Sequence, residues 1–220
     1  EEANEELEIS DYYKPSLERR MFRPPFIQFY ECNNVLIENV RIVNSPFWTI
    51  NPAFCDNVTV HGVTIYNPSK DPKGPNTDGI NPSSCRNVRI SDCFISVGDD
   101  CITIKSGRDA DGKACENITI TNCVMLSGHG GVVIGSEMSG GVRRVTISNC
   151  VFDGIDSGIR LKSSRGRGGV VEELRVDNIV MKNIQRNAFI FDLFYDKESK
   201  MEPVSERTPV FRNIHLSNIT

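Results

Sequence analysis

Four short polar motifs contain most of the residues in this chain that could carry out chemistry. They read Asn76-Thr77-Asp78-Gly79, Gly98-Asp99-Asp100-Cys101, Gly128-His129-Gly130 and Arg160-Leu161-Lys162. Together they supply three carboxylates, one imidazole and two cations. Carboxylates that lie close together repel one another, and this repulsion raises the pKa of at least one of them toward the value that a general acid needs. The motifs therefore predict one acid–base site, provided that the fold brings them together.

The segments around these motifs share a repeat of apolar residues. The repeat starts at seven aliphatic anchors: Val35, Val58, Val88, Ile118, Val145, Leu174 and Ile214. The anchors are 23, 30, 30, 27, 29 and 40 residues apart, within the range that is typical of solenoids and propellers. Apolar residues recur two and five positions after every anchor. This spacing predicts two short strands with a period of two in each repeat.

A residue that tolerates a positive φ separates these two strands in every repeat. Four positions after the anchors stand Asn39, Gly62, Asp92, Asn122, Asn149, Asn178 and Asn218. Such residues permit a tight corner, and Asn at the same corner of parallel coils would stack its side-chain amides along the axis. A third apolar segment follows each corner, as at 102–104, 132–134 and 159–161.

Three short strands per repeat, without helical periodicity, predict an all-β fold. We expect a right-handed, single-stranded parallel β-helix of about seven coils. A propeller blade would need a longer repeat of antiparallel strands, and a leucine-rich repeat would show regular Leu spacing and helical segments. The sequence has neither pattern.

The composition is compatible with one domain that buries a substantial core. The chain has 220 residues and a net charge of -4, which argues against a nucleic-acid partner held by bulk electrostatics. No apolar run approaches the length that spans a bilayer. We expect a monomer with a flanking segment at 1–25 and the β-helix at 26–220. Neither end shows a cap, which solenoids need for solubility, so we expect a fragment of a longer protein.

The eight cysteines could form disulfides or a metal site, but their positions favour another interpretation. Seven of them stand either three residues before an anchor or five residues after one, and no CxxC pair occurs. Free cysteine is among the most buried residue types. We therefore expect reduced cysteines that stack in columns inside the coils.

Aligning the third strands brings the motifs to one face. If Gly79, Cys101, Gly131 and Gly158 are equivalent, then Asp78 shares a column with Asp100, and Asp99 shares the next column with His129. Neighbouring coils lie about 4.8 Å apart. Carboxylates on neighbouring coils could span the roughly 6.5–9.5 Å that separates the acid and the base of an inverting glycoside hydrolase.

The alternation of the third strands also orients the cations. Ile159 and Leu161 match inward positions of the other coils, so Arg160 and Lys162 are expected to point outward, with Lys105 in the column of Lys162. The predicted groove therefore combines carboxylates with cations that could bind an acidic ligand.

At these residues the sequence resembles the polygalacturonase family, glycoside hydrolase family 28, over about residues 24–220. All four motifs occur in the order and spacing of that family. The resemblance implies a right-handed parallel β-helix that cleaves α-1,4-galacturonosyl linkages of pectin with inversion, without a cofactor or metal. It implies that Asp99 is the general acid, that Asp78 and Asp100 activate water, and that His129 supports the protonation state of the acid.

The resemblance also implies how the substrate binds. Arg160 and Lys162 would hold the galacturonate carboxylate, for which the planar fork of Arg is suited. Further contacts are expected from Asn76, Lys105, Arg108 and Glu137. The segment 135–141 is closer to exo-acting members than to endo-acting ones. The expected partner is an acidic plant cell-wall polysaccharide or an oligogalacturonide, and the expected location is secreted or periplasmic.

Three alternatives remain open on the sequence. Within the family, the substrate could be rhamnogalacturonan or xylogalacturonan. A polysaccharide lyase on the same fold would use a Ca²⁺-assisted site with a Lys or Arg base. A carbohydrate-binding solenoid without catalysis would bind sugar in the same groove and not turn it over.

Overall fold

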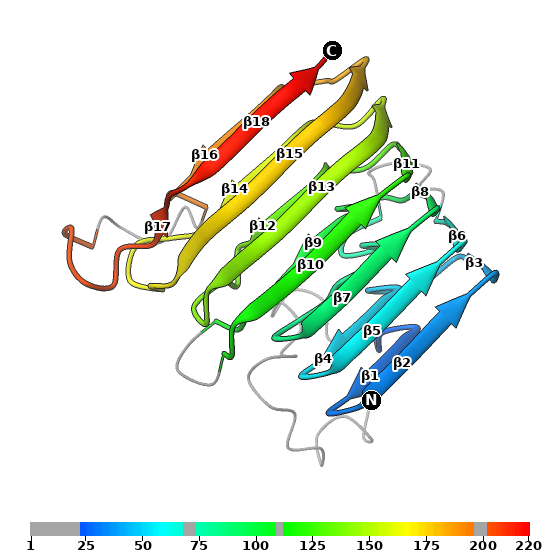
Figure 1. Cartoon of the computed structure of the whole chain (residues 1–220), viewed down its shortest axis with the longest axis horizontal. Helices are drawn as coiled ribbons and strands as arrows, with labels where there is room; N and C mark the ends of the chain where they lie inside the picture. Colours follow the sequence, from blue (N-terminus) through cyan, green and yellow to red (C-terminus); the bar gives the residue numbers. More distant parts are fainter. Residues whose placement is uncertain (1–22, 68–73, 109–111, 196–201) are drawn as a thin grey trace.

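In the computed structural model the chain forms a stack of parallel coils in which the assigned elements are all strands. The structure describes residues 23–67, 74–108, 112–195 and 202–220. Figure 1 shows strands of successive coils side by side, from β2 at one end of the stack to β18 at the other. The predicted all-β parallel β-helix is confirmed. Because residues 1–22 lie outside the described part, the boundary of the flanking segment at 1–25 stays a prediction.

One long sheet contains the first two strands of each repeat. Its first strands are β2 (Asn33–Glu38), β5 (Asp56–His61), β7 (Arg86–Ser91), β10 (Cys115–Thr121), β13 (Val142–Asp153), β15 (Val170–Lys182) and β18 (Ile214–Ile219). Its second strands are β3 (Arg41–Val43), β6 (Thr64–Tyr66), β8 (Phe94–Ser96) and β11 (Val124–Leu126). In β13 and β15 the two strands of the repeat are continuous, and the short β17 (Val210–Phe211) pairs with β15.

The third strands line the opposite side of the coils. They are β1 (Ile27–Tyr30), β4 (Ile50–Ala53), β9 (Ile102–Ile104), β12 (Gly130–Gly135), β14 (Ser157–Lys162) and β16 (Asn187–Asp192). Four of them form a continuous sheet in the order β16-β14-β12-β9, and β1 pairs with β4. Isolated bridges at Ile80 connect the two groups. The continuous sheet of third strands thus spans about four turns, which differs slightly from the seven coils expected, because the third strand around Ile80 is reduced to these bridges.

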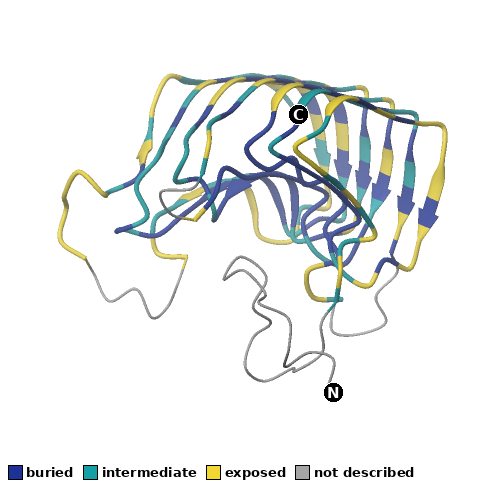
Figure 2. Ribbon diagram, turned by 90° about the horizontal axis from the view of Figure 1, so that it is seen from below, coloured by how far each residue is buried: buried dark blue, intermediate teal, exposed yellow. Residues whose placement is uncertain are grey.

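The pairing register places the seven predicted anchors in one line. The partners are Val35↔Val58, Val58↔Val88, Val88↔Ile118, Ile118↔Val145, Val145↔Leu174 and Leu174↔Ile214. The buried residues of Figure 2 lie on the inner side of the coils. Since strand side chains alternate between two faces, the period of two sends one set of residues into this core. Each fully buried Ile or Val contributes about 1.5–3 kcal/mol of transfer free energy.

The corners between the first two strands adopt the predicted left-handed backbone. All seven corner residues have φ between 51° and 61°. Their amides stack as expected at Asn178, whose Nδ2 donates to Asn149 Oδ1 at 2.8 Å. A second ladder just before the anchors was not predicted. There Asn117 has a φ of 58° and its Nδ2 donates to Asn87 Oδ1 at 2.9 Å.

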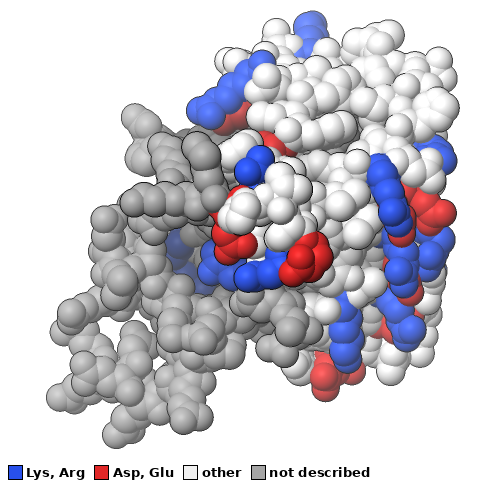
Figure 3. All heavy atoms as spheres, turned by 90° about the vertical axis from the view of Figure 1, so that its left-hand side faces the viewer, with Lys and Arg blue, Asp and Glu red and all other residues white. Residues whose placement is uncertain are grey.

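The cysteines and the ion pairs also follow the repeat. All eight cysteines are free, and seven are buried, with Cys32 half-buried, so the predicted columns of reduced thiols are confirmed. At the starts of the first strands, charged residues of neighbouring coils pair, as Arg86 Nη2 does with Asp56 Oδ2 at 2.7 Å. Figure 3 shows this side, where Lys and Arg lie beside Asp and Glu. In the described part of the chain, no helix has the length and apolarity needed to cross a membrane.

The corner ladder predicts a specific order of stabilities. Asn178→Ala should lower the free energy of unfolding by about 2–3 kcal/mol, because Ala strains the left-handed backbone and the hydrogen bond to Asn149 is lost. Asn178→Gly should cost about 1 kcal/mol less, because Gly adopts this φ freely. Urea unfolding of both variants measures the difference. Equal losses would show that backbone strain contributes nothing at this corner.

Candidate active site

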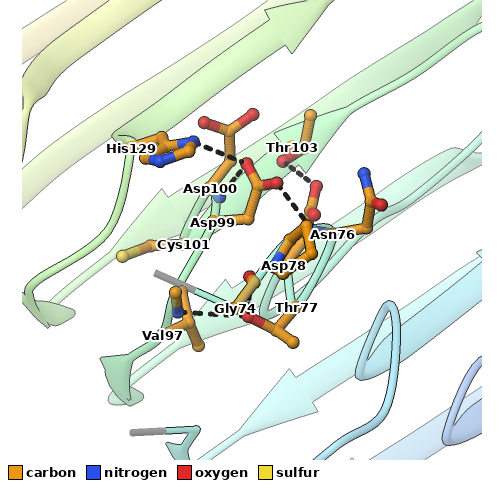
Figure 4. A network of polar contacts seen from close by, with 12 residues as sticks. Gly74, Asn76, Thr77, Asp78, Val97, Asp99, Asp100, Cys101, Thr103 and His129 are labelled. Atoms are coloured by element: carbon orange, nitrogen blue, oxygen red, sulfur yellow. Dashed lines mark hydrogen bonds and ion pairs between the residues drawn. The ribbon is translucent and has the colours of Figure 1, made fainter. Parts of the chain in front are cut away.

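The register brings the four predicted acid–base residues together. Gly79 N donates to Asp100 O at 3.0 Å, which places Asp78 beside Asp100. His129 N donates to Asp99 O at 2.9 Å, which places the imidazole one coil beyond that carboxylate. One oxygen from each of the three Asp side chains lies within 4.8 Å of the others, and Figure 4 shows the three carboxylates beside His129. The predicted columns are therefore confirmed.

Asp78 is buried and held by hydrogen bonds from its own coil and the next. Its side chain is 4 % exposed, and its Oδ2 accepts hydrogen bonds from Asn81 Nδ2 at 2.9 Å and Thr103 Oγ1 at 3.1 Å. Burial, with the negative charge of Asp99 next, raises the pKa of Asp78 to about 7. A carboxylate pKa is thus raised as expected, but burial is the larger cause and the repulsion from Asp99 the second.

Asp99 has the opposite electrostatic environment. Burial alone would raise its pKa, but the hydrogen bond and charge of His129, together with the Asn76 N–H, hold the pKa of Asp99 at about 2. His129 Nδ1 lies 3.3 Å from Asp99 Oδ1, and Asn76 N donates to Asp99 Oδ2 at 2.8 Å. The same contact with Asp99 raises the pKa of His129. The contact therefore favours an ionised carboxylate beside a protonated imidazole.

The negative charge of Asp100 is balanced by an ion pair with a cation from two coils away. Its side chain is 2 % exposed, and Lys162 Nζ donates to its Oδ2 at 2.7 Å. Its other oxygen, Oδ1, makes no hydrogen bond within the described residues. By distance alone the three carboxylates could hold a divalent cation, which prefers such oxygen ligands, but Lys162 already supplies positive charge to one of them.

The strand-connecting turns approach one another closely at two glycines. A Cβ on Gly98 would lie 2.5 Å from Gly74 N, so a side chain there would displace the turn that carries Asn76. Gly128 has a φ of 135°, and a Cβ on it would lie 2.7 Å from Asp99 O. Glycine before Asp99 and before His129 therefore lets the two neighbouring coils bring these side chains into contact.

Arg23, from the predicted flanking segment, fixes the turn that carries Asn76. Its Nη1 donates to Pro75 O at 2.8 Å and its Nη2 donates to Asn76 Oδ1 at 3.0 Å. Its guanidinium also lies 5.4 Å from the ring centroid of Phe47. The side chain of Asn76 thus accepts a hydrogen bond from Arg23, while the backbone N–H of Asn76 donates to Asp99.

A cavity of about 360 Å³ opens beside the acid–base residues. This volume lies at the lower end of the range for small-molecule sites. It is lined by Asp99, His129, Asp156, Ser157, Arg160, Lys162, Arg186, Asn187, Ile190 and Tyr195. Arg160 and Lys162 thus face the cavity, as their outward orientation predicted. Both cations also lie over the ring of Tyr195, at 5.7 Å and 5.0 Å from its centroid.

The other predicted substrate contacts lie away from this lining. Lys105 Nζ lies 3.0 Å from Glu137 Oε2, with side chains only 8 % and 18 % exposed, and 4.9 Å from the ring centroid of Trp48. Burial opposes ionisation of Glu137, yet the charge of Lys105 lowers its pKa. Arg108 is exposed. Among the described residues that line the cavity, Asn76, Lys105, Arg108 and Glu137 do not appear, and their contact with substrate stays a prediction.

Sequence reasoning missed several residues of the site. Extending the column of Asp99 and His129 by one more coil past Asp156 would have identified Arg186, because Ser157 pairs with Asn187. Tyr195 has no such signal, since it follows β16 outside the repeat. The partners of Asp78 were also missed, although Asn81 and Thr103 occupy equivalent outward positions, as the bridge Ile80↔Ile102 shows.

Comparisons with known proteins agree with this geometry. The model of glycosyl hydrolases family 28 matches residues 15–220. The chain belongs to this family. A probable polygalacturonase of Vitis vinifera is 39% identical over 168 residues, which cover 74% of this chain and 34% of that protein. An endo-polygalacturonase of Pectobacterium carotovorum subsp. carotovorum is 35% identical over 90% of this chain and 46% of that protein.

The solved structure of an exopolygalacturonase also superposes well. The exopolygalacturonase of Thermotoga maritima has a TM-score of 0.82 and 41% sequence identity, over 90% of this chain and 44% of that one. The chain thus spans between about a third and a half of the lengths of these proteins. The family resemblance seen in the four motifs is confirmed.

The pKa of Asp78 predicts a pH dependence of stability. The folded state keeps this proton up to about pH 7, whereas the ordinary pKa is 3.8. Between these values the unfolded state binds fewer protons than the folded state, so the contribution of Asp78 falls as the pH rises. Asp78→Asn removes this loss. The free energy of unfolding of the variant minus that of the wild type should therefore increase from about pH 4 to about pH 7, by on the order of a few kcal/mol.

Urea unfolding at several pH values measures this difference. Asp92→Asn is the matched control, because Asn occupies the same corner in five of the other six repeats, and its difference should change less with pH. A flat difference for Asp78→Asn would show that the folded state does not hold Asp78 protonated.

Proposed function

We propose that this protein is a polygalacturonase that hydrolyses α-1,4-galacturonosyl linkages of pectin. The observation that carries the proposal is the contact of Asp99 with His129 at the edge of a cavity that also presents Arg160 and Lys162. Acid–base residues and carboxylate-binding cations thus face the same space. Membership of glycosyl hydrolases family 28 supports this reaction class, and it disfavours the lyase alternative.

We assign the general acid to Asp99 on geometric grounds. Its side chain is 17 % exposed and lines the cavity, whereas Asp78 is 4 % exposed and lies behind it. A general acid must be within hydrogen-bond reach of the leaving oxygen, so reach takes precedence over pKa. The pKa of about 2 belongs to the ligand-free site. A bound acidic sugar adds negative charge beside Asp99 and raises its pKa toward that of a proton donor.

With Asp99 as the general acid, we assign the activation of the attacking water to Asp78 and Asp100. Both are almost fully buried, so a water molecule reaches an anomeric carbon more readily than either carboxylate does. Asp100 Oδ1 offers an acceptor that no described residue uses. An attack by water inverts the anomeric centre.

The carboxylate spacing differs from the expected one. The nearest oxygens lie within 4.8 Å, closer than the roughly 6.5–9.5 Å typical of inverting enzymes and nearer to the spacing of retaining ones. Retention through a covalent intermediate is therefore the second candidate. Proton NMR of the first product decides between them, because inversion releases the β-anomer and retention the α-anomer.

The substrate and the mode of action follow from the cations and the neighbours. Arg160 offers the planar fork that binds a carboxylate in two hydrogen bonds, so a galacturonate unit fits better than a neutral sugar. The similarity to the Thermotoga maritima exopolygalacturonase supports exo action, and the similarity to an endo-polygalacturonase keeps endo action as the competing mode. Because the polymer lies outside cells, a secreted or periplasmic location accompanies the proposal.

Product analysis on polygalacturonic acid and on rhamnogalacturonan tests the function. A polygalacturonase releases galacturonate or short oligogalacturonides from the first substrate, and exo action gives one product size from the earliest time points. Products that absorb in the ultraviolet would identify a lyase. Binding of both polymers without any product would leave a carbohydrate-binding solenoid.

Asp99→Asn should lower kcat by more than about a hundredfold, because the general acid is lost. Circular dichroism and urea unfolding should show a folded protein, since the amide keeps the shape of the side chain. Asp92→Asn, at a corner outside the cavity lining, should keep wild-type activity. Full activity of Asp99→Asn would transfer the role of acid to another residue, with Asp78 first because of its raised pKa.

A further inference from the structure

The cavity contains a third cation that the acid–base chemistry does not use. Arg186 lines the cavity together with Arg160 and Lys162. Lys162 is bonded to Asp100 at 2.7 Å, and Arg160 lies over Tyr195. Arg186 is exposed, and within the described residues its guanidinium forms no ion pair. Its positive charge is therefore available to a ligand in the cavity.

The register shows that Arg160 and Arg186 line the cavity from different positions along the strand direction. Arg186 is in register with Asp156 of the neighbouring coil. The backbone N–H of Arg186 donates to Asp156 O at 2.9 Å. Arg160 is four residues further along the strand direction, so their backbones are separated by roughly 13 Å in that direction at about 3.3 Å per residue. One carboxylate held by the guanidinium fork of Arg160 is thus distinct from one held by Arg186.

Arg186 also lies in the column of the acid–base pair. The column runs Asp99, His129, Asp156 and Arg186, one residue per coil. Three coil steps of about 4.8 Å place Arg186 roughly 14 Å from Asp99 along the axis. Asp156 stands between them in the column and lines the cavity, so its carboxylate disfavours an anionic group at the middle of the column. An acidic chain bound at the acid therefore meets its next favourable charge at Arg186.

We infer that Arg186 binds the carboxylate of a second acidic sugar unit, so that the site recognises at least two carboxylates of one polyuronide chain. The inference rests on the proposed function, which it extends from one acidic unit to a longer anionic ligand. The exposed Asn187 is next to Arg186 and lines the same cavity, where its amide can donate to the same unit. Methyl esterification of this second unit removes the charge that Arg186 recognises.

Isothermal titration calorimetry in the Asp99→Asn background tests the assignment without turnover. The ligands are galacturonate, trigalacturonate and fully methyl-esterified trigalacturonate. Arg186→Gln should weaken trigalacturonate binding by about tenfold to a hundredfold, the range expected for a lost charge-assisted hydrogen bond. It should leave the weak binding of galacturonate and of the ester unchanged. Arg186→Lys should restore part of the affinity, because the charge returns without the fork.

Arg41→Gln is the matched control. Arg41 is exposed on β3, outside the cavity lining, so this variant removes one positive charge without touching the site, and its trigalacturonate affinity should be unchanged. Equal affinity of Arg186→Gln and the Asp99→Asn parent for trigalacturonate would overturn the role of Arg186 and leave the proposed function intact. If the parent binds none of the three ligands, the proposed substrate class is wrong, and the inference falls with it.

Discussion

Parallel pairing in strict register is the constraint on which the rest of this structure depends. Each anchor residue pairs with the anchor of the next coil, so every position of one coil lies about 4.8 Å from its equivalent in the next. A side chain is therefore placed along the axis by its coil and around the axis by its repeat position. Residues more than twenty positions apart, such as Asp78 and Asp100, become neighbours because they share a repeat position.

This constraint also explains the division of charge in the site. Burial raises the pKa of Asp78, while His129 and the Asn76 N–H hold the pKa of Asp99 low. Two carboxylates on successive coils thus differ in protonation because Asp78 is buried, whereas Asp99 lines the cavity and contacts His129. The stacking brings Lys162 to Asp100 from two coils away, so three carboxylates can share the site without three uncompensated charges.

The cavity extends in one direction from the acid–base residues. Among the described residues, its cations come from β14 and from the turn before β16, on the side of the acid toward the later coils. On the earlier side, Arg23 is engaged with the turn at Asn76. The charged groups are therefore distributed asymmetrically about Asp99, with the cations of the cavity concentrated on one side. Under the proposed function, such asymmetry suits a ligand with repeated negative charges that is held mainly on one side of the bond to be cleaved.

The sequence by itself determined the periodic features of this protein. The period of two, the corner Asn residues and the cysteine columns follow from local rules of side-chain alternation and left-handed turns, so the fold class and the columns of Asp78, Asp99, Asp100 and His129 could be predicted. It also indicated that Arg160 and Lys162 face outward, because their apolar neighbours must face inward.

Only the tertiary structure decided which of these residues share one cavity and which pair elsewhere. Lys105 shares the outward column of Lys162, and Glu137 lies in a loop, so both were expected to contact the substrate. Their side chains instead form an ion pair with each other. Tyr195 and Arg23 come from segments outside the repeat, whose positions no periodicity specifies. The pKa values of Asp78 and Asp99 are shifted in opposite directions by burial and by individual hydrogen bonds, which an alignment of the repeats does not contain. The position of a residue in the repeat determines where its backbone lies. The contacts of a long side chain, and the course of a loop outside the repeat, depend on the tertiary structure.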